Sequence, residues 1–382
     1  MGIDPMWDDL SESLSDLRRC GRLRKLTPTD SRGVRLVLED GSELVNFGSN
    51  DYLGLAAVVG ESSPDRMSAG ATASALVCGW TRRHQCLADR IAALEETEAA
   101  VVFPSGYAAC SGTIAALGRS GDLILSDQLN HASLIDGCRL SRADCIVYPH
   151  RDMNSLAEVL ARCRGQYGRA WIVTNTVFSM DGHLAPLAEL ADIGDQFDAN
   201  LIVDEAHATG VLGDRGSGAC EWLGVKDRVA VRIGTLSKAL GSQGGFVAGP
   251  GVVIDYLLNH CRPLIYSTSL ALPAVESAIE AFDRIEREPE RRQRVRTLAE
   301  RVRMSLGLEC DPVEAVVPIL PIPVGQDGRA VELSARLRRS GLYVPAIRPP
   351  TVPDGQARLR VSLSASHSDE MVQRLIAGLA TL

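Results

Sequence analysis

Short apolar runs alternate with segments of helical periodicity through the middle of the chain. The apolar runs predict strands at 100–103, 123–126, 145–148, 171–174, 200–203, 229–233 and 245–248. The segments between them predict helices at 87–96, 107–117, 155–164 and 186–197. Strands that alternate with helices are typical of a mostly parallel sheet covered by helices on both faces. The pattern therefore predicts an α/β fold.

The two ends of the chain follow other patterns. Three leucines at helical spacing predict an amphipathic helix over 6–25. An Asp40-Gly41 turn between two runs of alternating apolar and polar residues predicts a hairpin over 34–47. A charged helical segment at 271–306 is interrupted near Pro289. Shorter strands and helices follow it and predict a smaller C-terminal α+β domain. We expect an N-terminal segment (1–45), a large domain (46–265) and a small domain (266–382).

Composition places the chain among ordinary folded proteins. It has 382 residues, 45% of them hydrophobic, and its 40 basic and 48 acidic residues give a net charge of −8. This balance argues against a nucleic-acid partner or an anionic membrane partner. No run approaches the roughly 20 apolar residues of a membrane span, and the first residues do not resemble a secretory signal.

The cysteines also bear on the class of protein. The 10 cysteines are scattered, and none form a C-x-x-C pair. This pattern favours buried thiols in a reducing cytoplasm over a disulfide framework or a metal site. We therefore expect a cytoplasmic protein without a bound metal.

Reactive side chains follow several of the predicted strands. In a parallel sheet, ligands bind at the carboxyl ends of the strands. Polar and reactive groups at these positions are Ser105, Gly106, Tyr107, His131, Ser179, Asp204, His207, Thr235 and Lys238. Each of them alone has an ordinary structural explanation, such as a turn, a helix cap or a surface charge. Their succession at one strand end after another favours a shared site.

Pyridoxal phosphate (PLP) requires this combination of groups. It needs a lysine amine for a Schiff base, a carboxylate that keeps its ring nitrogen protonated, a flat group over the ring and several donors for its phosphate. Lys238, Asp204 and His131 supply the first three, and the start of the helix at 107–117 supplies backbone N–H groups for a phosphate. A nicotinamide site is disfavoured, since no G-x-G-x-x-G follows an early strand.

Four strings resemble the α-oxoamine synthases, which are fold-type-I PLP-dependent transferases. They are NDYLGL at 50–55, FSMDG at 178–182, DEAHATG at 204–210 and TLSKALG at 235–241. The resemblance implies that Lys238 binds PLP and acts as the base, and that Asp204 pairs with its ring nitrogen. It further implies that His207 contacts the ring oxygen and His131 stacks on the ring. The implied cofactor-positioning residues are Gly106, Tyr107, Ser179 and Thr235, with Ser267 and Thr268 reaching the neighbouring subunit of a homodimer.

The resemblance also implies the reaction. IRPPTVP at 347–353 is most similar to family members that act in biotin synthesis, which condense L-alanine with a pimeloyl thioester, on coenzyme A or acyl carrier protein, and release CO₂. Arg348 would bind the amino-acid carboxylate, a task suited to a planar fork of donors. Arg24, Thr351 and His131 would contact the substrate.

Two departures from the family keep alternatives open. The loop at 70–79 has fewer glycines than in relatives and no basic residue, and Asn175 stands where relatives often have an acid. The first change bears on how the acyl thioester is held. The chain could therefore use another pair, such as glycine with acetyl-CoA or serine with a long-chain acyl-CoA. An inactive homologue that serves as a scaffold is the third alternative.

Overall fold

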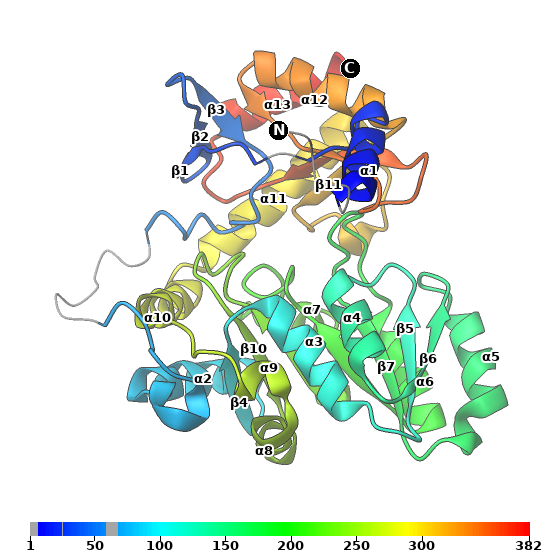
Figure 1. Ribbon diagram of the computed structural model, residues 1–382. Coiled ribbons are helices and arrows are strands. Elements are labelled where there is room, and N and C mark those ends of the chain that lie inside the picture. The colour runs from blue at the N-terminus through cyan, green and yellow to red at the C-terminus, as the bar shows by residue number, and fades with distance from the viewer. Residues whose placement is uncertain (1–6, 25, 59–67) are drawn as a thin grey trace.

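A seven-stranded sheet lies at the centre of the larger lobe in the computed structural model, which describes residues 7–24, 26–58 and 68–382 (Figure 1). The strand order is β4-β10-β9-β8-β7-β5-β6. The strands are β4 (Ala99–Phe103), β5 (Leu123–Asp127), β6 (Asp144–Tyr148), β7 (Ala170–Asn175), β8 (Ala199–Asp204), β9 (Val231–Thr235) and β10 (Gly245–Gly249). Strand β10 runs in the direction opposite to all the other strands of this sheet, which are parallel to one another. The predicted mostly parallel sheet is confirmed.

Helices cover both faces of this sheet, as the alternating pattern predicts. One face packs against α3 (Gly106–Leu117), α4 (Ala132–Leu140), α8 (Gly251–His260) and α9 (Arg262–Ile265) (Figure 1). The other packs against α2 (Arg82–Glu95), α5 (Met153–Cys163), α6 (Leu187–Phe197) and α10 (Leu272–Arg287). The buried side chains form a separate apolar cluster on each face. Helices α4 and α8 were not predicted, because neither has a long amphipathic repeat.

The smaller lobe combines both ends of the chain. Its first sheet has the order β1-β2-β3-β12 and contains β1 (Asp30–Arg32), β2 (Arg35–Val37), β3 (Glu43–Asn46) and β12 (Leu342–Tyr343). Its second sheet is antiparallel and contains β11 (Ile319–Gly325), β14 (Ala357–Ser362) and β13 (Ala346–Ile347). The predicted hairpin is present as β2 and β3. Because β3 pairs with β12, the N-terminal segment joins the C-terminal part of the chain. The domain limits at 45 and 265 stay predictions.

Helix α11 (Pro289–Leu306) links the two lobes, and helices α12 (Asp327–Arg339) and α13 (Asp369–Ala380) flank the smaller one. The larger lobe also contains the four-residue helix α7 (Ala219–Trp222). The predicted break near Pro289 separates α10 from α11, which leads from the larger lobe to the smaller one (Figure 1). No helix within the described ranges is long and apolar enough to cross a bilayer.

Helix α1 (Asp8–Arg19) confirms a helix in the predicted segment 6–25 but ends at Arg19, and positions 6 and 25 lie outside the described residues. Leu10 and Leu14 are each 51% exposed, so this helix buries little apolar surface against the described part of the chain. Just after the helix, Arg22 forms an ion pair with Asp327 of α12 at 2.6 Å. The segment is therefore attached to the smaller lobe by charge rather than by apolar packing.

Candidate active site

Asp204 lies at the carboxyl end of β8 and pairs in register with Asn175 at the end of β7. Its side chain is buried, with 4% of the residue exposed. The carboxylate accepts hydrogen bonds from the Asn175 amide at 3.0 Å, the backbone N–H of Ala206 at 2.8 Å and the Cys110 thiol at 3.5 Å. No lysine or arginine within the described ranges forms an ion pair with it. Asp204 is thus a buried anion that no side-chain cation neutralises at contact distance, an arrangement that is costly unless a bound cation completes it.

Lys238 lies in the turn after β9, in the neighbourhood of Asp204. Burial lowers the pKa of its amine, and the charge of Asp204 opposes this shift without cancelling it. A lowered pKa raises the fraction of neutral amine at neutral pH. The side chain has no hydrogen-bond partner in the described part of the chain. These properties suit an amine that reacts or accepts a proton.

The turn that carries Lys238 depends on a glycine. Gly241 donates its N–H to the Lys238 carbonyl at 3.0 Å and has a φ of +63°. A Cβ atom at this position would lie 2.7 Å from Cα of Ala56 and 2.8 Å from the carbonyl carbon of Leu55. The NDYLGL string therefore packs its backbone directly against the lysine turn, which only glycine permits.

His207 lies in the loop after β8, and its Nδ1 is 2.7 Å from the hydroxyl of Tyr52 in the NDYLGL string. Tyr52 is fully buried and His207 is nearly so. Burial, together with the charges of Lys238 and Arg360, holds the pKa of His207 well below its usual range. The imidazole is therefore neutral at neutral pH.

Arg360 in β14 brings the smaller lobe into the site, and it was not among the predicted residues. Its Nε donates to the Ser179 carbonyl at 2.5 Å, and its Nη1 donates to Asn50 at 3.1 Å and to Ser362 at 2.7 Å. Its Nη2 is buried and has no hydrogen-bond partner among the described residues. The signal that could have revealed it is an arginine in a strand whose six residues are all buried.

A second group of donors lies where α3 begins. Ser105 caps the helix by accepting the N–H of Ala108 at 3.1 Å. A Cβ atom on Gly106 would lie 3.1 Å from Oγ1 of Thr235, so the helix start and the end of β9 are in direct contact. Oγ1 of Thr235 lies 2.7 Å from the hydroxyl of Ser237. Free N–H groups of a helix start beside two hydroxyls can bind a phosphate.

His131 and Asp204 are connected by Asn175. The backbone N–H of His131 donates to the side-chain oxygen Oδ1 of Asn175 at 2.8 Å, while Nδ2 of Asn175 donates to Asp204 at 3.0 Å. The imidazole ring of His131 is exposed and meets the edge of Tyr107, with ring centroids 6.2 Å apart. Asn175 was noted from the sequence only as a departure. Because an ionised acid could not donate to Asp204, the asparagine has a definite task here.

Ser179 lies in the turn between β7 and α6, which a chain of polar groups holds in place. Asp127 accepts from Nδ1 of His150 at 2.9 Å, and Nε2 of His150 lies 3.2 Å from Nδ1 of His183 at the end of the turn. The ends of β5 and β6 thus fix the turn from one side. Arg360 fixes it from the other through the Ser179 carbonyl.

The remaining predicted residues lie apart from this group. Thr268 forms an isolated bridge with Ser74, beside the π-helical turn η2 (Ala75–Gly79). Within the described residues, Gly106 lies against Thr235 and not against Ser267 or Thr268. The role of these two residues at a neighbouring subunit stays a prediction.

Three of the predicted substrate residues, Arg24, Arg348 and Thr351, lie at the seam between the N-terminal segment and the smaller lobe, whereas the fourth, His131, lies beside Asn175. Arg24 donates to the hydroxyl of Thr351 at 3.0 Å, and Arg348 donates to the backbone carbonyl of Gly21. All of these bonds stay within the seam, and none of them reaches Asp204. Arg348 uses Nη1 for its bond to Gly21.

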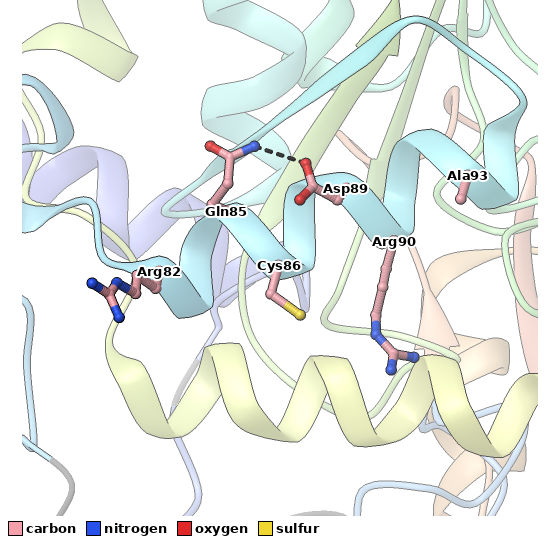
Figure 2. Close-up of a pocket in the computed structure, with 6 residues that line it drawn as sticks. All are labelled: Arg82, Gln85, Cys86, Asp89, Arg90 and Ala93. Carbon is pink, nitrogen blue, oxygen red and sulfur yellow. Dashed lines mark hydrogen bonds between the residues drawn. The ribbon is translucent and has the colours of Figure 1, made fainter.

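A surface pocket of about 400 Å³ lies elsewhere, on the outer side of α2 (Figure 2). It is lined by Arg82, Gln85, Cys86, Asp89, Arg90 and Ala93. Gln85 donates to Asp89 at 2.8 Å, and Arg90 forms an ion pair with Asp283 of α10. None of the candidate site residues lines it, so it is separate from the active site.

The fold and the group around Asp204 define an α/β protein with a ligand site at the carboxyl ends of parallel strands. Residues 42–379 match the aminotransferase class I and II family. The chain belongs to this family.

Two kinds of known enzyme are similar to this chain over nearly its whole length. The chain is 44% identical over 381 residues to an 8-amino-7-oxononanoate synthase of Anaeromyxobacter dehalogenans, covering 98% of this chain and 95% of the relative. It superposes on a serine palmitoyltransferase of Sphingomonas wittichii with a TM-score of 0.90 and 29% identity, covering 100% and 98% of the two chains. A structure described as this type of enzyme with a PLP internal aldimine is 25% identical, with the same TM-score and coverage. The resemblance to the α-oxoamine synthases is confirmed.

The turn that carries Lys238 can be tested with two matched glycine variants. Gly241→Ala adds a methyl group that meets the backbone of Leu55 and Ala56, whereas Gly224→Ala adds one at a similar φ of +68° with nothing within 4 Å. We expect Gly224→Ala to lower the free energy of unfolding by about 1 kcal/mol and Gly241→Ala by at least about 2 kcal/mol more. Urea unfolding measures both. Equal losses would show that the NDYLGL backbone does not press on the lysine turn.

Proposed function

We propose that this chain is a PLP-dependent 8-amino-7-oxononanoate synthase. It condenses L-alanine with a pimeloyl thioester and yields 8-amino-7-oxononanoate, CO₂ and a free thiol. The buried, unneutralised carboxylate of Asp204 beside Lys238 is the observation that carries the proposal. The 44% identity over nearly the whole chain supports the choice of substrates.

The residues present fit PLP. The buried anion of Asp204 would hold a protonated pyridine nitrogen, because that cation supplies the missing opposite charge. The exposed ring of His131 offers a flat surface, and His207 offers a nitrogen for the ring oxygen. The start of α3 with Thr235 would bind the phosphate. When bound, PLP supplies a carbonyl that condenses with amines and a ring that withdraws electrons from the neighbouring carbon.

Lys238 performs the proton transfer in this proposal. Its Nζ must be neutral to accept a proton from the α-carbon of the amino acid. Burial lowers the pKa of the amine and so provides that neutral form. The Lys238 amine has no hydrogen-bond partner among the described residues, since the donors recorded at the Asp204 carboxylate are Asn175, Ala206 and Cys110.

Arg360 is the residue that we propose for the amino-acid carboxylate. Its guanidinium is held by three hydrogen bonds, and its Nη2 is the one group of the side chain left without a partner. A buried guanidinium with an open donor favours an incoming anion. Arg348 is the carboxylate site that the sequence resemblance implies, but it lies at the seam with the N-terminal segment, where its Nη1 donates to Gly21, rather than beside Ser179 and Asn50.

The two classes of relatives differ in substrate. Serine palmitoyltransferases share the fold closely but only 29% of the sequence in the example above, whereas the 8-amino-7-oxononanoate synthase shares 44%. The complete set of Asp204, Lys238, His207 and His131 argues against an inactive scaffold. The synthase of the biotin pathway is therefore favoured over both alternatives.

A product assay with purified protein and PLP tests the function. We expect L-alanine with pimeloyl-CoA or pimeloyl-acyl carrier protein to give a product with the mass of 8-amino-7-oxononanoate. Glycine with acetyl-CoA and L-serine with palmitoyl-CoA should be at least about 100-fold slower. Turnover of one of these pairs in place of alanine would overturn the assignment of substrates.

The visible absorbance of the PLP-loaded protein provides the control. Lys238→Ala should abolish the lysine-dependent band and reduce turnover by a factor of at least about 10³, because both the covalent attachment and the base are lost. Lys226→Ala removes a lysine that pairs with Glu96 at 2.8 Å before the start of β9, at the opposite end of this strand from Lys238, and it should keep both properties. A wild-type protein that binds no PLP would support the scaffold alternative.

Two lysine substitutions identify the carboxylate site. Arg360→Lys should raise KM for L-alanine about 10- to 100-fold, since a charge-assisted hydrogen bond contributes about 1.5–3 kcal/mol. Arg348→Lys should affect KM for L-alanine less than twofold if its bond to Gly21 is structural. Steady-state kinetics at saturating acyl donor measures both. The reverse pattern would assign the carboxylate to Arg348.

We also infer that two copies of the chain form a homodimer in the cytoplasm. Leu76, Val77 and Tyr266 are 54%, 77% and 72% exposed around the Ser74–Thr268 bridge, which places an apolar surface beside the predicted cross-subunit residues. The ten cysteines are all free, as in a reducing compartment.

Light scattering tests the dimer. We expect a mass of about twice 41.0 kDa. Val77→Asp should shift the protein toward monomer, because a buried charge at an interface is costly. Met304→Asp introduces the same charge at a residue that is 83% exposed in the smaller lobe, and it should leave the dimer intact. A monomeric wild-type protein would contradict the inference.

A further inference from the structure

Four side chains from three distant parts of the sequence form a continuous hydrogen-bonded row. Nη1 of Arg360 lies 3.1 Å from Oδ1 of Asn50, the same Oδ1 lies 3.1 Å from the hydroxyl of Tyr52, and that hydroxyl lies 2.7 Å from Nδ1 of His207. Arg360, Tyr52 and His207 are buried. The row joins a donor-only group at one end to an imidazole at the other.

The arginine fixes the direction of every bond in the row. A guanidinium has donors and no acceptor, so Asn50 must turn its carbonyl oxygen toward Arg360. The same oxygen also meets Tyr52. Because Oδ1 carries no proton, the hydroxyl of Tyr52 must donate its only proton to it.

The direction of the Tyr52 hydrogen bond determines which nitrogen of the His207 imidazole carries the proton. With its proton given to Asn50, the oxygen of Tyr52 can only accept from His207. The short 2.7 Å bond therefore requires a proton on Nδ1. Since burial keeps the ring neutral, Nε2 then has no proton. If Tyr52 donated its proton to His207 instead, the Tyr52 hydroxyl oxygen and Oδ1 of Asn50 would lie 3.1 Å apart with no proton between them.

We propose that Arg360, acting through Asn50 and Tyr52, fixes His207 as the tautomer with its proton on Nδ1, so that Nε2 is a hydrogen-bond acceptor. Asn50 and Tyr52 are positioning residues in this arrangement. Nε2 selects a proton donor, such as an amine or a protonated ring oxygen, over an anion.

The arrangement is compatible with a bound carboxylate. Nη1 of Arg360 holds Asn50, whereas Nη2 has no partner. An incoming carboxylate at Nη2 would leave the row intact, so one guanidinium serves both purposes. This last step rests on the proposed function, but the tautomer itself does not.

Nitrogen-15 NMR of the histidine-labelled full chain, without PLP or substrate, tests the proposal. The His207 signals are assigned by their loss in His207→Asn. We expect a protonated Nδ1 and a nonprotonated Nε2 in the wild type. A protonated Nε2 would overturn the proposal, whatever the protein's activity, so its failure is distinct from failure of the proposed function.

Three variants separate the row from general effects of substitution. Tyr52→Phe removes the acceptor and should abolish the fixed proton on Nδ1. Asn50→Asp keeps an acceptor between Arg360 and Tyr52 and should retain it. Tyr148→Phe removes another buried hydroxyl, one without a hydrogen-bond partner, and should leave the His207 signals unchanged. Retention of the Nδ1 proton in a folded Tyr52→Phe, or its loss in a folded Asn50→Asp, would contradict the proposal.

Discussion

The structure depends on one electrostatic constraint, the negative charge of Asp204 at the buried end of β8. Three donors satisfy its oxygens, but none of them is a cation. A buried charge of this kind is costly unless an opposite charge completes it. A ligand with a positive charge would offset this cost. Burial also lowers the pKa of the Lys238 amine, which favours its neutral form. One property, exclusion from water, therefore produces both halves of the site.

Two lobes must meet for the site to be complete. The larger lobe supplies Asp204, Lys238 and the start of α3, all at strand or helix ends where the backbone fixes their positions. The smaller lobe supplies Arg360, which binds the Ser179 carbonyl of the larger lobe. The NDYLGL string lies between them, packed on Gly241 at one end and bonded to Arg360 through Asn50 at the other. In the proposed function, recognition of the amino-acid carboxylate by Arg360 would therefore depend on the relative position of the lobes.

The sequence predicted the parts of the site that follow long apolar runs. Apolar runs show where strands end, and Asp204, His207 and Lys238 follow such runs. The sequence alone therefore predicts these three residues. Arg360 could not be found in this way, because its role arises from contacts with Asn50, 310 positions away in the chain. Arg348 lies in a string that resembles the family, but a string does not show where a side chain points. The α1 helix was predicted from a periodicity that the folded chain leaves unpacked.

The number and direction of its hydrogen-bond donors explain why position 360 is an arginine rather than a lysine. Nε and Nη1 are used to hold Ser179, Asn50 and Ser362, which fixes the plane of the guanidinium. A fixed plane aims the remaining Nη2 in one direction without further loss of conformational entropy on binding. A lysine at this position would carry the same charge on a single rotatable ammonium group. It could not hold a rigid row toward His207 and keep a directed donor for an anion at the same time. Under the proposed function, the buried arginine would therefore join the orientation of His207 to the recognition of the substrate carboxylate.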